Sequence, residues 1–191
     1  MTTQVTPATA DKRTRLVESA AKLTYEQGFH RTTLADISRD SGVPLGNVYY
    51  YFKTKEAIAD ALIDMFVARY GELVKQWEAK ADPKARIESF IQMTVENRDS
   101  LARSGCPVGT LCSELRKEGG AVADRAATVF ENLLHWLEAQ FLLLGKRNEA
   151  PGLAVHVVST LEGASLLANT FNDPRYVVRE ANRLKAWVRS L

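Results

Sequence analysis

The sequence of 191 residues predicts an all-α protein. After the first ten residues, nearly every segment carries apolar residues at spacings of three and four, the period of an amphipathic helix. The strict alternation of a half-buried strand is hard to find. Capping residues, glycines and prolines separate these segments at helical lengths. With 46% hydrophobic and 25% charged residues, the composition is that of a soluble globular protein with a buried core.

The chain begins with a Thr- and Ala-rich stretch, residues 1–10, which we expect to form a flexible arm. A first helix is expected from about Asp11 to Gln27. Gly28 is a suitable stop, because glycine readily adopts the left-handed conformation that ends many helices. The apolar face of this helix would comprise Leu16, Val17, Ala20 and Leu23.

Two short helices are expected next. Thr33 is a good N-cap for the first of them, Asp36 completes a capping-box pattern three residues later, and Gly42 ends it. Pro44 suits the first turn of the following helix, because proline is favourable where the backbone N–H needs no partner. We expect this helix to reach about Phe52.

The rest of the chain is expected to form six more helical segments. The first of these, residues 55–80, is long for a globular helix, so we expect it to bridge two regions. The others are expected at residues 83–101, 106–117, 121–144, 151–171 and 174–191. This division predicts a helix-turn-helix domain at residues 11–60, with its motif at about residues 33–52, and a second helical domain at residues 61–191.

Composition and motifs argue against several functional classes. The 25 Lys and Arg against 23 Asp and Glu give a net charge of +2, which excludes a globally basic binder of nucleic acid. The chain has no G-x-S-x-G elbow, phosphate loop or H-E-x-x-H motif, and the spacing of its two cysteines is not that of a zinc site. We therefore expect no enzyme activity, no cofactor and no metal. The first residues do not resemble a signal peptide, and no uncharged apolar run approaches the ~18 residues of a membrane span, so we expect a cytoplasmic protein.

The two short helices and the turn Ser41-Gly42-Val43 between them have the sequence form of a helix-turn-helix. In this arrangement the third helix of the chain can place its N-terminal half in a major groove about 12 Å wide. Val48 and Phe52 lie four residues apart and are the expected inward anchors of this helix. The rest of its surface is then free to contact DNA.

Several residues on and beside the third helix are suited to that contact. Gly46 would let the backbone approach a phosphate closely, and Asn47 offers both a donor and an acceptor to a base edge. Tyr49 and Tyr50 can donate hydrogen bonds to phosphate oxygens, and two basic side chains add charge beside them. The basic pair is Lys53 and Lys55. The DNA prediction depends on this placement, because the net charge of the region through residue 60 is small.

The run from Gly28 to Leu62 closely resembles the DNA-binding region of the TetR family of bacterial transcriptional regulators. The resemblance lies in the G-F-x-x-T-T start, the G-V turn, the G-N-V-Y-Y-Y-F segment and the following K-x-K-E, and it covers about residues 11–60. It implies that several positions lie at or near DNA, namely Thr33, Pro44, Leu45, Asn47, Tyr49, Tyr50 and Lys55. Pro44 and Leu45 stand where Ser or Thr and Lys are common in the family. Leu45 could touch a thymine methyl group or fold back toward Val48.

For residues 61–191 the resemblance implies a helical ligand-binding and dimerisation domain. Family members pair two helices from each chain into a four-helix bundle. The expected interface comprises Gly163, Ala164, Leu167, Val177, Ala181, Leu184 and Val188. The last four form a narrow stripe at 4-3-4 spacing, and the small residues before them would allow close backbone approach. A contact within one chain explains the same pattern.

The second domain is also expected to bind a small, largely apolar effector. The candidate pocket residues are mainly aromatic side chains at helical spacing, and they comprise Phe66, Tyr70, Trp77, Phe90, Met93, Cys106, Phe130, Trp136 and His156. Aromatic residues in such a pattern are also typical of a protein core. Each candidate therefore has a purely structural alternative.

The segment GCPVGTLCSEL contains both cysteines. If Pro107 is the first helical residue, Cys106 lies at the N-cap, where free backbone N–H groups and the helix dipole lower the pKa of a thiol. A similar glycine-cysteine segment occurs in a branch of the TetR family that includes regulators of drug efflux and some sensors of reactive compounds. Cys106 is therefore a candidate sensor. The alternative is that Cys106 and Cys112 are small buried hydrophobic residues.

The resemblance implies a ligand-responsive transcriptional regulator, a homodimeric repressor that a small molecule releases from a near-palindromic operator in double-stranded DNA. Ligand binding would favour a dimer whose recognition helices are wrongly spaced, and the long helix at residues 55–80 would transmit the change. Two alternatives are a helical ligand-binding module that does not bind DNA, and an enzyme. A steep loss of duplex affinity with salt would distinguish a DNA binder from a ligand-binding module.

Overall fold

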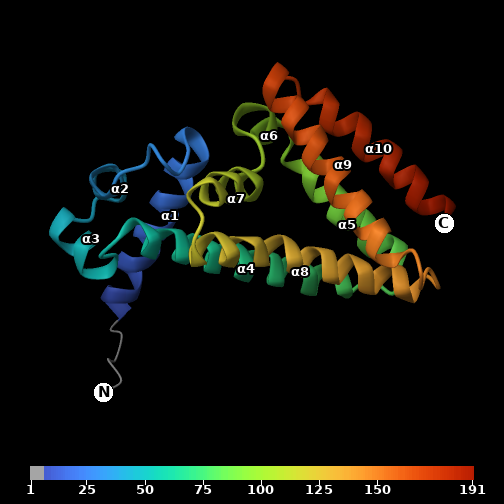
Figure 1. The fold of residues 1–191 in the computed structure, drawn as a ribbon, viewed down its shortest axis with the longest axis horizontal. Coiled ribbons are helices and arrows are strands. Elements are labelled where there is room, and N and C mark those ends of the chain that lie inside the picture. Colours follow the sequence, from blue (N-terminus) through green and yellow to red (C-terminus); the bar gives the residue numbers. More distant parts are fainter. Residues whose placement is uncertain (1–6) are drawn as a thin grey trace. The chain divides into compact units, whose positions relative to one another are not determined.

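The structure is a computed structural model that describes residues 7–191, so residues 1–6 of the expected arm lie outside the described residues. Residues 7–191 form ten helices and no strand (Figure 1), which confirms the predicted all-α fold. The helices are α1 Pro7–Gln27, α2 Leu34–Ser41, α3 Leu45–Tyr51, α4 Lys55–Glu78, α5 Pro83–Glu96, α6 Arg98–Ser104, α7 Pro107–Glu118, α8 Ala121–Leu143, α9 Ala150–Phe171 and α10 Arg175–Ser190.

Most helix ends lie within about two residues of the expected positions, which is the usual uncertainty of a helix boundary. α1 begins earlier than expected, at Pro7 and not at Asp11. Proline is favourable in the first turn of a helix, and the prediction of an arm overlooked this signal. Residues 7–10 of the expected arm therefore belong to α1.

The helix expected at residues 83–101 is two helices, α5 and α6, because Asn97 interrupts it. Asn97 has φ −94° and ψ 6°, and its Nδ2 donates a hydrogen bond to the Met93 carbonyl at 2.8 Å. A short amide side chain that binds a nearby backbone carbonyl competes with the regular helix ladder. α5 therefore ends there, and the chain restarts as α6.

The chain divides into two compact units. The first unit comprises the chain up to Phe66 together with Thr110–Ala126, and the second comprises Val67–Gly109 together with Ala127–Leu191. The expected boundary near residue 60 is close to the first of these divisions. The membership of residues 110–126 in the first unit had no signal in the sequence. As a result, α4, α7 and α8 each contribute residues to both units.

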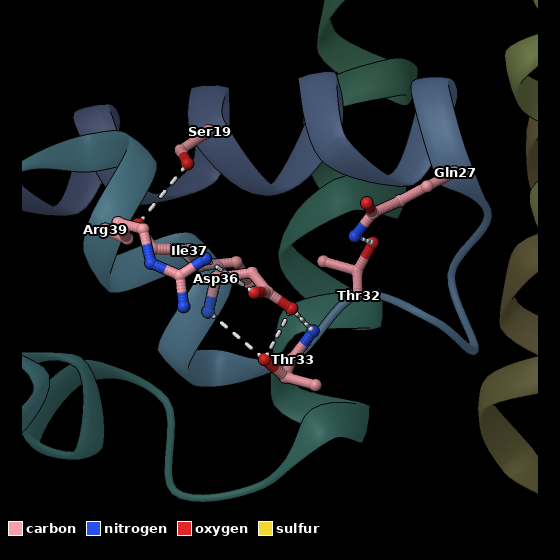
Figure 2. A network of polar contacts seen from close by, with 7 residues as sticks. All are labelled: Ser19, Gln27, Thr32, Thr33, Asp36, Ile37 and Arg39. Carbon is pink, nitrogen blue, oxygen red and sulfur yellow. Dashed lines mark hydrogen bonds and ion pairs between the residues drawn. The ribbon is translucent and has the colours of Figure 1, made fainter.

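The core of the first unit contains apolar residues from α1, α2 and α3. Leu16, Ile37 and Val48 are at most 1% exposed. Ser19 Oγ donates a hydrogen bond to the Ile37 carbonyl at 3.3 Å and so ties α1 to α2 (Figure 2). Phe52, directly after α3, is also buried. Both expected inward anchors, Val48 and Phe52, are therefore confirmed.

The second unit is built from packed helices in which α10 contacts α5 and α9, and α9 contacts α6. Its main core cluster includes Trp77, Ile87, Phe90, Ile91, Leu133, Trp136, Leu137, Phe141, Val157, Leu161 and Leu184. α9 is the one described helix whose length and composition would also suit a membrane span. It buries one face within the unit, as the core helix of a globular protein does.

The stripe on α10 that was expected at a dimer interface packs within the chain. Val177, Ala181, Leu184 and Val188 are all at most 3% exposed, and α10 buries this face against α5 and α9. The prediction that these four residues face a second chain was wrong, because intrachain packing accounts for the stripe. Ala164 of α9 is buried in the same way.

Candidate nucleic-acid interface and ligand site

The start of α2 is fixed by the capping box that the sequence predicts. Asp36 N donates to Thr33 Oγ1 at 3.1 Å, and Thr33 N donates to Asp36 Oδ2, also at 3.1 Å (Figure 2). Thr33 Oγ1 donates to Asp36 Oδ2 at 2.6 Å, and this hydrogen bond, together with the one from Thr33 N, holds the pKa of the Asp36 carboxyl below its usual range. Thr33 is exposed, so its side chain lies at the surface while it caps the helix.

The turn between α2 and α3 depends on a glycine. Gly42 has φ +66°, the left-handed conformation that other residues adopt at a cost. A Cβ at Gly42 would also lie 3.1 Å from Arg15 Nη2, and Arg15 donates a hydrogen bond to the Ser41 carbonyl at this turn. Arg15 therefore links α1 to the end of α2, and the turn can sit closely against it.

α3 buries one face and exposes another. Val48 is fully buried, whereas Leu45 is 38%, Tyr49 52% and Tyr50 71% exposed. Leu45 thus points outward and does not fold back onto the core. Of the remaining candidates, the N-cap Pro44 and Gly46 are also exposed, whereas Asn47 is half-buried. The exposed residues of α3 therefore include two phenols, an apolar side chain and a glycine, and the amide of Asn47 is partly accessible.

The two lysines after α3 differ in their surroundings. Lys53 is exposed. Lys55 Nζ donates to the His30 carbonyl at 2.7 Å and lies 4.8 Å from the centre of the Phe29 ring, a cation–π contact. Lys55 therefore joins the start of α4 to the α1–α2 loop, a structural contact that the sequence did not signal.

The α1–α2 loop also receives a carboxylate from α7. Phe29 N and His30 N donate to Glu114 Oε1 and Oε2 at 3.1 and 2.8 Å. Gly28, at φ +89°, leaves room for this carboxylate, since a Cβ there would lie 3.1 Å from Glu114 Oε1. His30 Nδ1 lies 3.0 Å from Oε1 of Glu118, the last residue of α7. Sequence reasoning missed Glu114, because 84 or more residues separate it from its partners.

We expect Glu114→Ala to destabilise the first unit by about 1–3 kcal/mol, because it removes two charge-assisted hydrogen bonds and leaves two backbone donors without this acceptor. Glu118→Ala is the matched control. It removes one contact of a more exposed carboxylate with His30, and we expect a much smaller change. Urea unfolding of the two variants measures the difference. Equal losses of stability would contradict the role assigned to Glu114.

Three of the expected pocket residues form an aromatic core cluster in the second unit. The ring centre of Trp77 lies 5.6 Å from that of Phe90 and 5.1 Å from that of Trp136. Each of these residues is at most 8% exposed. These three rings therefore pack against one another in the core, and Trp77 and Trp136 each also line a hollow.

The other expected pocket residues are scattered. Phe66 is buried in the first unit, and Phe130 is half-buried on α8. His156 is exposed and packs its ring edge to face with Trp187 at 5.0 Å between ring centres. His156 therefore lies on the surface of α9, and the prediction that it lines a pocket is not supported by this position.

Two hollows open within the second unit. One of about 230 Å³ has mostly apolar walls formed by Val67, Tyr70, Gly71, Val74, Val129, Asn132, Leu133 and Trp136. The other, of about 460 Å³, is more polar and is lined by Leu73, Gln76, Trp77, Lys80, Ala85, Glu88, Ser89, Gln92, Met93, Glu96 and Lys185. The candidates therefore divide between two hollows, with Tyr70 and Trp136 at one and Trp77 and Met93 at the other.

Cys106 lies at the start of α7, as predicted, but its chemistry differs from the prediction. Gly109 N donates to Cys106 Sγ at 3.4 Å, which is the contact of an N-cap. Burial raises the pKa of the Cys106 thiol well above its ordinary value, and the nearby Glu162 carboxylate raises it further. The expected lowering of this pKa was therefore wrong. Desolvation and a neighbouring negative charge outweigh the helix terminus.

α9 exposes an apolar face. Leu166 is 66% and Phe171 60% exposed, and Leu167 and Val155 are also exposed. Gly163, an expected interface residue, is exposed within this face. Of the expected interface residues, Gly163 and Leu167 are thus available to another molecule. Among the residues that the structure describes, no group of three or more His, Cys, Asp or Glu is placed to hold a metal ion.

Comparisons with known proteins match both parts of the chain. Residues 16–62 match the family described as bacterial regulatory proteins, tetR family. Residues 83–181 match the family described as the C-terminal domain of LmrA/YxaF-like transcriptional regulators.

Whole-chain relatives agree with these matches. The chain is 31% identical over 170 residues to the HTH-type transcriptional regulator Rv0196 of Mycobacterium tuberculosis, covering 84% of this chain and 86% of that protein. It is 28% identical over 187 residues to the HTH-type transcriptional regulator YxaF of Bacillus subtilis, covering 94% and 96%.

Solved structures share the fold. A TetR transcriptional regulator from Chloroflexus aurantiacus has a TM-score of 0.82 at 21% identity, covering 94% of this chain and 95% of that one. The reduced form of Escherichia coli NemR has a TM-score of 0.77 at 20% identity, covering 92% and 96%.

Proposed function

Because the chain belongs to the TetR family of bacterial transcriptional regulators, which bind DNA through a helix-turn-helix, we propose that it is a cytoplasmic homodimeric repressor that a small molecule releases from its operator. The observation that carries the proposal is the two-sided α3, with Val48 buried and Tyr49 and Tyr50 exposed. A helix that is anchored on one side and polar on the other is suited to a major groove.

We assign different tasks to the residues on this surface. Asn47 reads a base edge, because its amide offers a donor and an acceptor together. Tyr49, Tyr50 and Lys53 bind phosphates and set the position of the helix without reading sequence. Thr33 lies at the N-terminus of α2, where backbone N–H groups and the helix dipole also favour a phosphate. The N-cap Pro44 and the first two residues of α3, Leu45 and Gly46, approach the groove floor. Lys55 contributes charge beside its contact with the loop.

We expect Asn47→Ala to lower the preference for the operator over random duplex by about 10- to 100-fold, the discrimination of a good base contact of ~1–3 kcal/mol. Lys53→Ala should instead weaken binding to both duplexes similarly and reduce the salt dependence by about one phosphate contact. Fluorescence anisotropy at several salt concentrations measures both effects. Equal losses on operator and random duplex for Asn47→Ala would contradict its assignment to base reading.

The proposed dimer uses the exposed face of α9, at Gly163, Leu166 and Leu167. Exposed leucines beside a glycine suit a helix–helix contact, since the missing side chain lets two backbones approach. Two-fold pairing would present two α3 helices to successive major-groove faces, which predicts a near-palindromic operator.

The proposed effector response depends on helices that belong to both units. α4, α7 and α8 each begin in one unit and end in the other, so a ligand that favours one arrangement of the second unit would also bias the first. The response can be no larger than the ratio of the ligand's affinities for the two states.

One experiment tests the function as a whole. Duplexes from the genome that encodes the protein would be selected for binding, and the selection would be repeated with candidate small molecules. Recovery of a near-palindromic sequence that some compound releases is expected. If no duplex is retained, even at low salt, the chain is a ligand-binding module without DNA binding.

A further inference from the structure

A half-buried carboxylate stands out in the second unit. Glu162 is the one acidic residue of α9, whose other residues are mostly apolar. Its Oε2 lies so close to α7 that a Cβ at Gly109 would be only 2.5 Å from it. The glycine therefore leaves the space that the carboxylate occupies. A desolvated carboxylate is costly unless a donor or a cation compensates it.

The protein itself supplies little to offset the desolvation of the Glu162 carboxylate. In the described part of the chain, burial raises the pKa of Glu162, a hydrogen bond from the Cys106 thiol lowers it, and no cation contributes. A thiol is a weak donor, whereas a carboxylate can accept about four hydrogen bonds. Most of the acceptor capacity of Glu162 thus remains for another partner.

Tyr70 connects this carboxylate with the apolar hollow. Burial raises the pKa of the Tyr70 phenol, Cys106 and Glu162 raise it further and Arg69 lowers it, so the phenol lies within electrostatic reach of all three. Tyr70 also lines the 230 Å³ hollow between α4 and α8, together with Trp136. Aromatic side chains favour a cation over their faces. The hollow is smaller than the ~300–1,000 Å³ of sites for drug-sized ligands, which indicates a small ligand.

We propose that the second unit binds a small organic cation, with an amine held by Glu162 and Tyr70 and an apolar body placed in the hollow beside Trp136. The proposal rests on the proposed function, since it names the chemical class of the effector. Its structural alternative is that Glu162 only stabilises the start of α7.

Three probes of similar size and different charge test this assignment. Phenethylamine is a cation, phenethyl alcohol is neutral and hydrocinnamate is an anion at neutral pH. Isothermal titration calorimetry with the full chain is expected to show the amine binding about tenfold or more tightly than the alcohol, because the half-buried Glu162 carboxylate attracts the added charge. Hydrocinnamate should bind most weakly.

Variants identify the carboxylate responsible. Glu162→Gln should remove the preference for the amine and leave the affinity for the alcohol, and Glu162→Asp should retain part of the preference. Glu131→Gln, which neutralises an exposed glutamate of α8 in the same unit, is the matched control and should behave as the natural chain. Circular dichroism checks that each variant is folded.

Several outcomes would overturn the assignment. These are no binding of any probe, no preference for the amine in the natural chain, or an unchanged preference in Glu162→Gln. Operator binding is measured separately and without the probes. If the chain binds an operator that neutral compounds release, only the cation assignment fails. If it retains no duplex, the proposed function fails whatever the calorimetry shows.

Discussion

A chain carrying both Leu166→Glu and Leu167→Glu is expected to be monomeric and to bind an operator duplex about 100-fold or more weakly, because the second half-site no longer adds its avidity. These leucines are 66% and 43% exposed, so the substitutions do not disturb the core of the single chain. At an interface, however, the four added carboxylates of two chains would have to be desolvated close together. Analytical ultracentrifugation gives the mass, and fluorescence anisotropy gives the affinity.

The matched control is Leu142→Glu with Leu143→Glu at the end of α8. These residues are 45% and 64% exposed and receive the same added charge. The control is expected to remain dimeric and to bind the operator normally. A dimeric Leu166 and Leu167 double variant, or a monomer with full operator affinity, would show that the exposed face of α9 is not the functional interface.

Phe52→Ala is expected to destabilise the first unit by about 3–5 kcal/mol, the usual cost of truncating a buried phenylalanine. Phe52 is 3% exposed, and the Arg13 guanidinium lies 5.7 Å from its ring centre. Its backbone N donates to the Val48 carbonyl at 2.8 Å and so ties Phe52 to the end of α3. The buried ring therefore holds this end of the helix on the core. Since a domain is stable by only about 5–15 kcal/mol, DNA binding should fall with the folded fraction.

Tyr50→Ala provides the comparison for this prediction. Tyr50 is 71% exposed, so its truncation should leave the stability nearly unchanged and weaken DNA binding through a lost phosphate contact. Urea unfolding measures stability, and amide hydrogen exchange reports on α1 to α3 separately. If Phe52→Ala were as mild as Tyr50→Ala, the ring would not be the anchor of α3.

Local signals predicted the first unit well. Thr33, Asp36 and Gly42 act on neighbours in the chain, so their pattern alone predicts where α2 begins and ends. Val48 and Phe52 are four residues apart on one short helix, and their spacing identifies the buried face. The family resemblance, now confirmed, added which exposed residues are expected at DNA. Their contacts with DNA remain predictions.

Contacts between distant segments could not be predicted. Glu114 and the loop at Gly28–His30 are far apart in sequence, and no sequence pattern around a single helical glutamate identifies its binding partner. The apolar stripe at Val177–Val188 could be recognised in the sequence, but such a helix face can pack equally well within its own chain or against a second chain. For Cys106, the position at a helix start was predictable. The cluster that it packs against comes from α6, α9 and α10, and the carboxylate that raises its pKa further comes from α9.

The discontinuous first unit has a consequence for exchanging recognition domains between regulators. A chimera joined at Phe66 would carry the Gly28–His30 loop into a partner whose residues at 110–126 come from another protein. The backbone donors of Phe29 and His30 would then meet a foreign side chain where Glu114 belongs. Transplanting this DNA specificity therefore requires two segments, the N-terminal region and residues 110–126, so that the loop keeps its own carboxylate.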